Sequence, residues 1–229
     1  MKNSLEHLVP AGTLPLNHRV RDAERTGAGA PPCLLLLHGV GANELGFIEL
    51  AQRLDPRLVV VLARGPLVFG PQQFGWFQVS FTATGPVPNL AQAEQSRLTL
   101  IDFIAGLPAA YGVDPANIWV GGFSQGGIVS ASVGLTQPDL VAGFAILSGR
   151  ILPEIAPLTA DVAALRGLHA FVSHGVYDSK LPIAFGRNSE QLLREKEVQL
   201  TYREYEADHE LNGAMQHDFG QWLTACIDA

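Results

Sequence analysis

Short apolar runs alternate with longer segments along most of the chain. A run such as Leu34–Leu37 is apolar at every position, which is typical of a strand whose two faces are both buried in a parallel sheet. Six runs of this kind predict strands, at Leu34–Leu37, Leu58–Leu62, Ile118–Val120, Val141–Leu147, Leu168–Val172 and Val198–Tyr202.

The segments between these runs predict helices, because apolar residues recur in most of them at spacings of three and four. The predicted helices are Asn43–Leu54, Leu90–Tyr111, Ser124–Leu135, Leu181–Lys196 and Leu211–Ile227. Strands that alternate with helices favour a mostly parallel sheet with helices on both faces. The predicted fold class is therefore α/β.

Residues 63–88 break this alternation. The segment is rich in Gly and Pro and predicts a long structured loop. Its aromatic residues follow no helical period: Phe69, Phe74, Trp76, Phe77 and Phe81. Two interpretations stay open, since these rings could wall an acyl or aryl pocket or could cap the core.

Length and composition indicate one globular domain over residues 1–229. The apolar runs are too short to span a bilayer, so we expect no integral membrane association. A formal net charge of −7, without clusters of Lys or Arg, disfavours nucleic acid as a partner. Residues 1–7 lack a basic-then-apolar signal pattern, which predicts a cytoplasmic protein.

The two cysteines, Cys33 and Cys226, are too few for a disulfide framework or a cysteine metal site. We interpret both as packing residues. A bond between them stays open, although a reducing compartment would disfavour it.

The strongest chemical signal is the motif Gly122-Phe-Ser-Gln-Gly126, a G-x-S-x-G pattern between a predicted strand and a predicted helix. In this context the serine occupies a sharp turn that exposes its hydroxyl. Glycines flank it because a Cβ atom would collide in so tight a corner. Glycine-rich turns also bind phosphates or allow close packing, so Ser124 is a candidate nucleophile that needs partners.

A serine nucleophile requires a base, which in α/β-hydrolases is a histidine that follows the acid along the chain. Four histidines follow Ser124: His169, His174, His209 and His217. Only His209 comes after a predicted strand and directly before a helix. It is the predicted base.

The acid is expected on the preceding loop, residues 174–182, whose one carboxylate is Asp178. Asp208 is adjacent to His209 and would need strained geometry to bond the same imidazole. The alternative for Asp178 is a cap of the helix that follows.

Acyl transfer also needs donors for the oxyanion, normally the amide after the nucleophile and an amide after an early strand. These are Gln125 and Val40, where Gly39 and Gly41 allow the loop to turn its amides inward. Because both act through backbone, we expect their side chains to matter little. His38 is interpreted as a scaffold residue and not as a proton carrier.

With these residues identified, the chain resembles the phospholipase/carboxylesterase family of small serine esterases, which includes acyl-protein thioesterases and bacterial carboxylesterases. The resemblance covers about residues 33–225. It rests on Leu37-His-Gly-Val-Gly41, Arg64-Gly-Pro66, Gly75-Trp-Phe77, Gly122-Phe-Ser-Gln-Gly-Gly127, Leu147-Ser-Gly149 with Pro153, His174-Gly175 with Asp178, and His209-Glu210.

The resemblance implies an α/β-hydrolase without a separate cap domain that cleaves small-molecule carboxylic esters and uses no metal or cofactor. It implies the triad Ser124, Asp178 and His209, and some relatives are dimers, so a homodimer is compatible. Two departures leave the substrate open: Gln78 stands where the family commonly has Asp, and Ala42-Asn43 replaces an acidic residue.

We therefore expect a serine carboxylesterase that forms an acyl-enzyme at Ser124, with Trp76 and Phe77 as substrate-binding residues. An acyl thioesterase or a lysophospholipase on the same triad stays open. A peptidase is disfavoured, because 229 residues leave no room for the cap or propeller that peptidases of this fold usually carry. A catalytically silent binding protein is disfavoured too, because all three triad members are present.

Overall fold

The computed structural model of the chain describes residues 5–24, 29–82 and 85–229. Residues 1–4 of the N-terminal segment that lacks a signal pattern lie outside the described residues, as does the side chain of Phe81.

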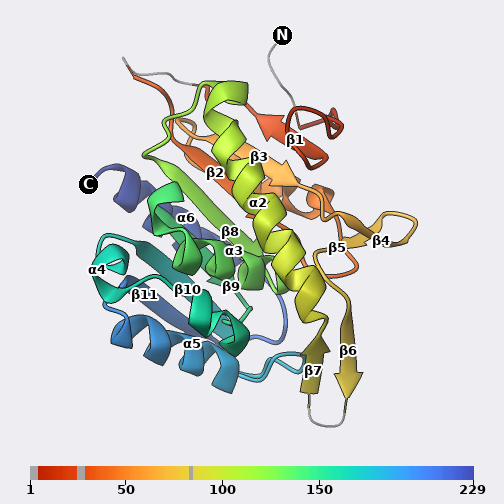
Figure 1. Ribbon diagram of the computed structural model, residues 1–229. Coiled ribbons are helices and arrows are strands. Elements are labelled where there is room, and N and C mark those ends of the chain that lie inside the picture. Colours follow the sequence, from red (N-terminus) through yellow and green to blue (C-terminus); the bar gives the residue numbers. More distant parts are fainter. Residues whose placement is uncertain (1–4, 25–28, 83–84) are drawn as a thin grey trace.

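A seven-stranded sheet crosses the molecule in the order β1-β3-β2-β8-β9-β10-β11 (Figure 1). Neighbours from β3 to β11 pair in parallel, and β1 pairs antiparallel with β3 at one edge. The strands are β1 (His18–Arg21), β2 (Cys33–Leu37), β3 (Val59–Ala63), β8 (Ile118–Phe123), β9 (Gly143–Leu147), β10 (His169–Gly175) and β11 (Gln199–Tyr205). The predicted mostly parallel sheet is confirmed, and the six predicted strands all appear.

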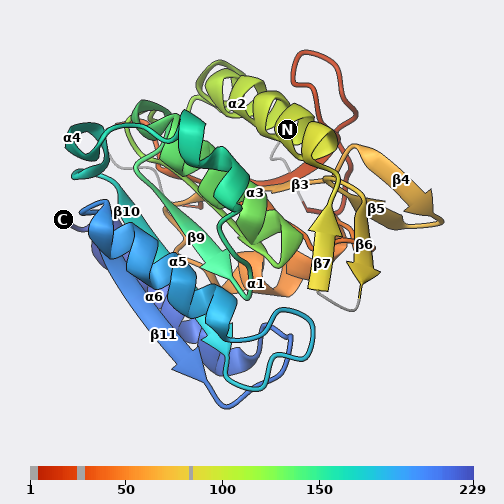
Figure 2. The same ribbon diagram turned by 60° about the horizontal axis from the view of Figure 1, so that its bottom comes forward.

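Side chains alternate between two cores, one on each face of the sheet. Leu35 and Leu37 of β2 belong to one core, and Leu34 and Leu36 belong to the other. The first core includes residues of α2 (Leu90–Tyr111), α3 (Gln125–Thr136) and α5 (Ala184–Glu195), and the second includes residues of α1 (Ile48–Arg53) and α6 (Gly213–Ile227). Helices therefore cover both faces, as the all-apolar strands require (Figure 2).

Helix α2 has the predicted bounds because a capping residue stands at each end. The side chain of Asn89 accepts a hydrogen bond from the Gln92 amide at the first turn. At the other end Gly112 adopts a φ of 64°, a left-handed conformation that glycine tolerates best.

The helix predicted over Asn43–Leu54 is divided in two. A 3-10 turn, η1 (Glu44–Phe47), follows Asn43, whose side chain caps it, and α1 begins only at Ile48. The remaining helical elements are short: η2 (Pro138–Leu140), η3 (Pro153–Leu158) and α4 (Val162–Leu165).

The segment predicted as one long loop contains two antiparallel hairpins. They are β4 (Leu67–Gly70) with β5 (Gln73–Gly75), and β6 (Val79–Thr82) with β7 (Gly85–Pro88). The β4–β5 pairing has a register irregularity and β7 contains two prolines, so neither hairpin has the alternating pattern that identifies a strand in sequence. Both hairpins lie outside the central sheet, and β7 leads directly into α2 (Figure 1).

None of the helices in the described ranges is long and apolar enough to cross a bilayer.

Candidate active site

Ser124 stands at a sharp turn between β8 and α3. Its φ of 54° and ψ of −115° lie outside the regions that a serine normally adopts, which is the strained geometry of a nucleophile elbow. A Cβ atom at Gly122 would lie 2.6 Å from the Leu37 carbonyl oxygen, and one at Gly126 would meet the same oxygen. Both glycines are therefore required by the close approach of β2, as the motif predicts.

The structure brings Ser124, His209 and Asp178 together. The His209 Nε2 atom lies 2.9 Å from the Ser124 Oγ atom, and its Nδ1 atom lies 2.7 Å from Asp178 Oδ2. The three residues follow β8, β11 and β10, whose parallel carboxyl ends meet at one edge of the sheet. With Nδ1–H donating to the carboxylate, Nε2 is free to accept the serine proton.

Asp178 is fully buried and accepts hydrogen bonds on both oxygens. Its Oδ1 atom accepts from the amides of Lys180, at 2.9 Å, and Leu181, at 2.7 Å. Burial favours the protonated form, but hydrogen bonds from His174, His209 and the Leu181 amide outweigh it and hold the pKa of Asp178 well below its usual range. Asp178 thus orients the imidazole and also caps its own loop, so the two interpretations of this residue are compatible.

His174 was not among the predicted site residues, yet it contacts the same carboxylate from inside the sheet. Its Nε2 atom lies 2.7 Å from the Leu181 carbonyl oxygen and 3.3 Å from Asp178 Oδ2, and its side chain is fully buried. A Cβ atom at Gly186 of α5 would lie 2.9 Å from the His174 ring. The sequence signal was the spacing of His174 and Asp178, which are four residues apart, at the end of β10 and on the loop that follows it.

Val40 and Gln125 both line the cavity in front of Ser124. Within the ranges that the structure describes, neither backbone amide donates a hydrogen bond. Gly41, with a φ of 74°, turns the loop directly after Val40. The two N–H groups are thus available to an oxyanion.

The expectation that the side chain of residue 125 matters little is wrong. The buried Gln125 side chain accepts a hydrogen bond from the Trp76 amide at 2.7 Å and donates one to the Phe77 carbonyl oxygen at 2.7 Å. It therefore attaches the elbow to the segment between β5 and β6. Nothing in the G-x-S-x-G pattern specifies this contact, because the partners are almost fifty residues away.

His38 supports the loop that carries Val40, in agreement with its interpretation as a scaffold residue. Its Nε2 atom accepts a hydrogen bond from the Gly65 amide at 2.9 Å, and its carbonyl oxygen accepts one from the Trp76 indole at 2.9 Å. Burial lowers the pKa of His38 and so favours the neutral imidazole.

A cavity of about 280 Å³ lies in front of Ser124. Apolar side chains form most of its wall, and two cationic residues, Arg150 and Lys180, also contribute. The lining residues are Gly39, Val40, Ala42, Phe77, Val79, Pro86, Pro88, Phe123, Ser124, Gln125, Ile128, Arg150, Lys180, Leu181 and His209.

The predicted aromatic residues divide between the two interpretations. Phe77 lines the cavity, whereas Trp76 is buried behind it and binds His38. Phe69 and Phe74 do not reach the wall either. Phe123, which follows the β8 glycines, lines the cavity and packs against the His209 ring in a tilted arrangement, with ring centroids 4.9 Å apart.

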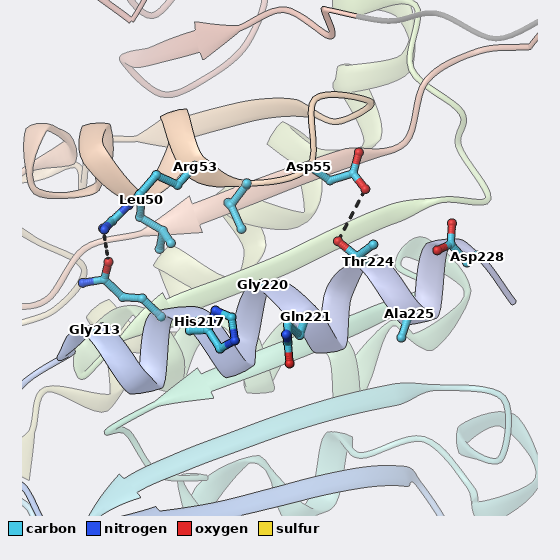
Figure 3. Close-up of a pocket in the computed structure, with 12 residues that line it drawn as sticks. Leu50, Arg53, Asp55, Gly213, His217, Gly220, Gln221, Thr224, Ala225 and Asp228 are labelled. Carbon is cyan, nitrogen blue, oxygen red and sulfur yellow. Dashed lines mark hydrogen bonds between the residues drawn. The ribbon is translucent and has the colours of Figure 1, made fainter.

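A larger hollow, of about 720 Å³, lies between α1 and α6 (Figure 3). Arg53, Asp55, His217 and Thr224 line it, and none of the triad residues does. Over residues 5–24, 29–82 and 85–229 no cluster of metal-binding side chains occurs. Cys33 and Cys226 are both free thiols.

Comparison with known proteins agrees with this arrangement. The family model described as phospholipase/carboxylesterase matches residues 23–227. The chain belongs to this family. It is accordingly a hydrolase with the α/β-hydrolase fold, and the alternative of a silent binding protein is set aside.

Curated relatives include acyl-protein thioesterase 1 of Mycosarcoma maydis, 29% identical over 74% of this chain and 78% of the relative. Acyl-protein thioesterase 1 of Emericella nidulans is 24% identical over 86% of this chain and 90% of the relative. Among solved structures, the Bacillus cereus carboxylesterase superimposes with a TM-score of 0.80 at 22% identity, covering 92% of this chain and 94% of that chain. At that identity the likeness establishes the fold.

Proposed function

We propose that this member of the family is a serine carboxylesterase that forms an acyl-enzyme on Ser124. The observation that carries the proposal is the continuous path from Asp178 Oδ2 through the His209 ring to Ser124 Oγ, with contacts of 2.7 Å and 2.9 Å. Nucleophile, base and orienting acid then occupy the geometry that acyl transfer requires.

In the first half-reaction His209 Nε2 accepts the proton of Ser124 as Oγ attacks the acyl carbon. Asp178 stabilises the resulting imidazolium, and the amides of Val40 and Gln125 bind the oxyanion. Collapse of the tetrahedral species expels the alcohol, which receives its proton from His209. Water then repeats these steps on the acyl-enzyme and releases the acid.

The cavity supports a small ester as the substrate. Its volume of about 280 Å³ lies just below the range of small-molecule pockets, roughly 300–1,000 Å³. A short acyl chain fits such a volume better than a palmitoyl chain. We place Phe77 in the substrate-binding wall and assign Trp76 to the support of the Val40 loop.

Thioester hydrolysis is a second candidate, because curated relatives are named acyl-protein thioesterases. The same triad and oxyanion donors would serve it. Parallel assays of an oxygen ester and its thioester analogue distinguish the two.

The test of the proposed function is Ser124→Ala, assayed on p-nitrophenyl esters from acetate to palmitate and by fluorophosphonate labelling. We expect kcat to fall by at least about 10⁴-fold and labelling to disappear, since the nucleophile is gone. The exposed Ser80 of β6 provides the matched control, because Ser80→Ala should retain both. Labelling of Ser124→Ala at another residue would refute the assignment.

We also propose that the protein is cytoplasmic, which the two unpaired cysteines support. A homodimer is a separate proposal, which light scattering of the purified protein tests.

A further inference from the structure

The cavity beside Ser124 contains a cation that the hydrolytic steps do not use. Arg150 follows β9, which lies between the strand of the nucleophile, β8, and the strand of the acid, β10. Its side chain lines the same cavity as Ser124 and His209. The loop that carries Val40 follows β2, on the other side of β8, so Arg150 and this loop follow strands on opposite sides of the strand that leads to Ser124.

Two contacts hold the Arg150 guanidinium in place. The group lies over the Phe185 ring of α5, with its central carbon 4.6 Å from the ring centroid. One terminal nitrogen donates a long hydrogen bond of 3.3 Å to the Pro86 carbonyl oxygen of β7. Arg150 is thus held between a helix and a hairpin, and its Nε atom is buried without a hydrogen-bond partner among the described residues.

The charge of Arg150 is not compensated by any residue that the structure describes. Across the described ranges Arg150 forms no ion pair, although most of the other arginines do. Burial lowers the pKa of Arg150, and the exposed Glu154 opposes this only from a distance. A half-buried guanidinium with an unpartnered N–H costs stability, which an anion bound in the cavity would recover.

Lys180 adds a second positive charge at the rim. It lies on the loop after β10 that carries Asp178, is exposed, and forms no ion pair within the residues that the structure describes. Two cations that form no ion pair with any described residue therefore line a mostly apolar cavity of a protein whose formal net charge is −7.

We propose that the cavity takes esters that carry an anionic group, a carboxylate or a phosphate, which Arg150 binds while Lys180 attracts it at the rim. The proposal rests on ester hydrolysis at Ser124. The planar guanidinium presents several N–H groups that match two oxygens of such an anion. The anion belongs either to the acid half of the ester, as in the monoester of a dicarboxylic acid, or to a phosphorylated alcohol.

Matched ester pairs test the proposal. For the acid half, monoethyl glutarate is compared with ethyl 5-methylhexanoate, in which an isopropyl group replaces the carboxylate. For the alcohol half, 2-acetoxyethyl phosphate is compared with 2-tert-butoxyethyl acetate. Acid release in a pH-stat should give a kcat/KM at least about tenfold higher for the anionic member of one pair, and that pair identifies the half that carries the anion.

Arg150→Gln should abolish that preference, whereas Arg166→Gln, at an exposed ion pair with Glu197, should preserve it. Should Arg150→Gln fail to fold, the wild-type protein still provides a test, because added salt should weaken the preference by screening the charges. A wild-type enzyme that hydrolyses both neutral members as fast as the anionic ones would overturn the inference, as would an unchanged preference in Arg150→Gln. In either case, loss of the neutral-ester reaction in Ser124→Ala shows that the proposed function itself stands.

Discussion

Asp178 concentrates four donors on one buried carboxylate. Two backbone amides hold Oδ1, and the imidazoles of His209 and His174 approach Oδ2 at 2.7 Å and 3.3 Å. The two amides fix the orientation of the whole carboxylate, so Oδ2 is directed toward His209 Nδ1. His174 supports it from the core side, so we regard His174 as a positioning residue for the acid.

We predict that Asp178→Asn lowers kcat by about 10³–10⁴-fold, because an amide at this position would hold the His209 ring in the wrong tautomer. Burst and steady-state kinetics on a p-nitrophenyl ester provide the measurement. Asp208→Asn is the matched control, since Asp208 binds the amides of Ser179 and His209 and not the ring. An equal fall in kcat in both variants would show that a disturbed loop, and not the missing Asp178 carboxylate, causes the loss.

At the scale of elements, a buried ion cluster connects segments that are distant in sequence. Glu44 of η1 has a fully buried side chain. Its Oε1 atom lies 3.0 Å from Nε of Arg19 in β1 and 2.7 Å from Nη2 of Arg64, which follows β3. Arg64 in turn lies over the Phe74 ring of β5, 4.5 Å from its centroid. The cluster therefore attaches the edge strand and the β4–β5 hairpin to the turn that follows the Val40 loop.

We predict that Glu44→Gln lowers the free energy of unfolding by about 3 kcal/mol at pH 7, because removing one partner leaves two half-buried guanidinium groups uncompensated. Urea unfolding measures the change. Glu197→Gln removes an exposed ion pair with Arg166 and should change stability little. Equal stabilities of wild type and Glu44→Gln would mean that the cluster contributes nothing net.

The difference in the free energy of unfolding between wild type and Glu44→Gln should become smaller as pH falls. Burial favours the protonated carboxyl of Glu44, but hydrogen bonds from Arg64 and Arg19 prevail and lower its pKa in the folded state. Such a group stabilises the fold above its unfolded pKa of about 4.3, and the contribution is lost as pH falls through the folded pKa. The gap between wild type and Glu44→Gln should therefore narrow below about pH 4.

At the scale of the whole molecule, the sheet is covered on both faces and its central strands are inaccessible. Cys33 of β2 lies between β3 and β8 and is fully buried, and burial raises the pKa of its thiol to about 12. Cys226 of α6 is only partly buried. Modification of Cys226 therefore requires less unfolding of the protein than modification of Cys33.

We predict that a disulfide reagent labels Cys33 only when the protein unfolds globally, because β2 cannot leave the sheet locally. In a Cys226→Ser variant, which retains one thiol, the labelling rate should follow the unfolding equilibrium measured in urea. Rapid labelling of the native variant would contradict this and would indicate local opening of the sheet.

The sequence by itself determined the central strands and the elbow. All-apolar runs encode burial on both faces, and the glycines at 122 and 126 encode a turn with no space for a Cβ atom. The order of Ser124, Asp178 and His209 along the chain, each after a strand, was sufficient to nominate all three, because parallel strands end at a common edge. These signals are local, with a period or a spacing that one segment carries alone.

Only the tertiary structure decided the contacts between distant segments. The edge strand β1 and the two hairpins have no clear pattern of their own, since their stability comes from pairing and from ion pairs such as Arg19 with Glu44. The position of the segment before α2 relative to the Ser124 turn decides two further contacts. Phe77 and not Trp76 lines the cavity, and the Gln125 side chain binds the backbone of both residues. The charge of Arg150, which has no ion-pair partner among the described residues, belongs to the same class, because a missing partner is visible only in the folded structure.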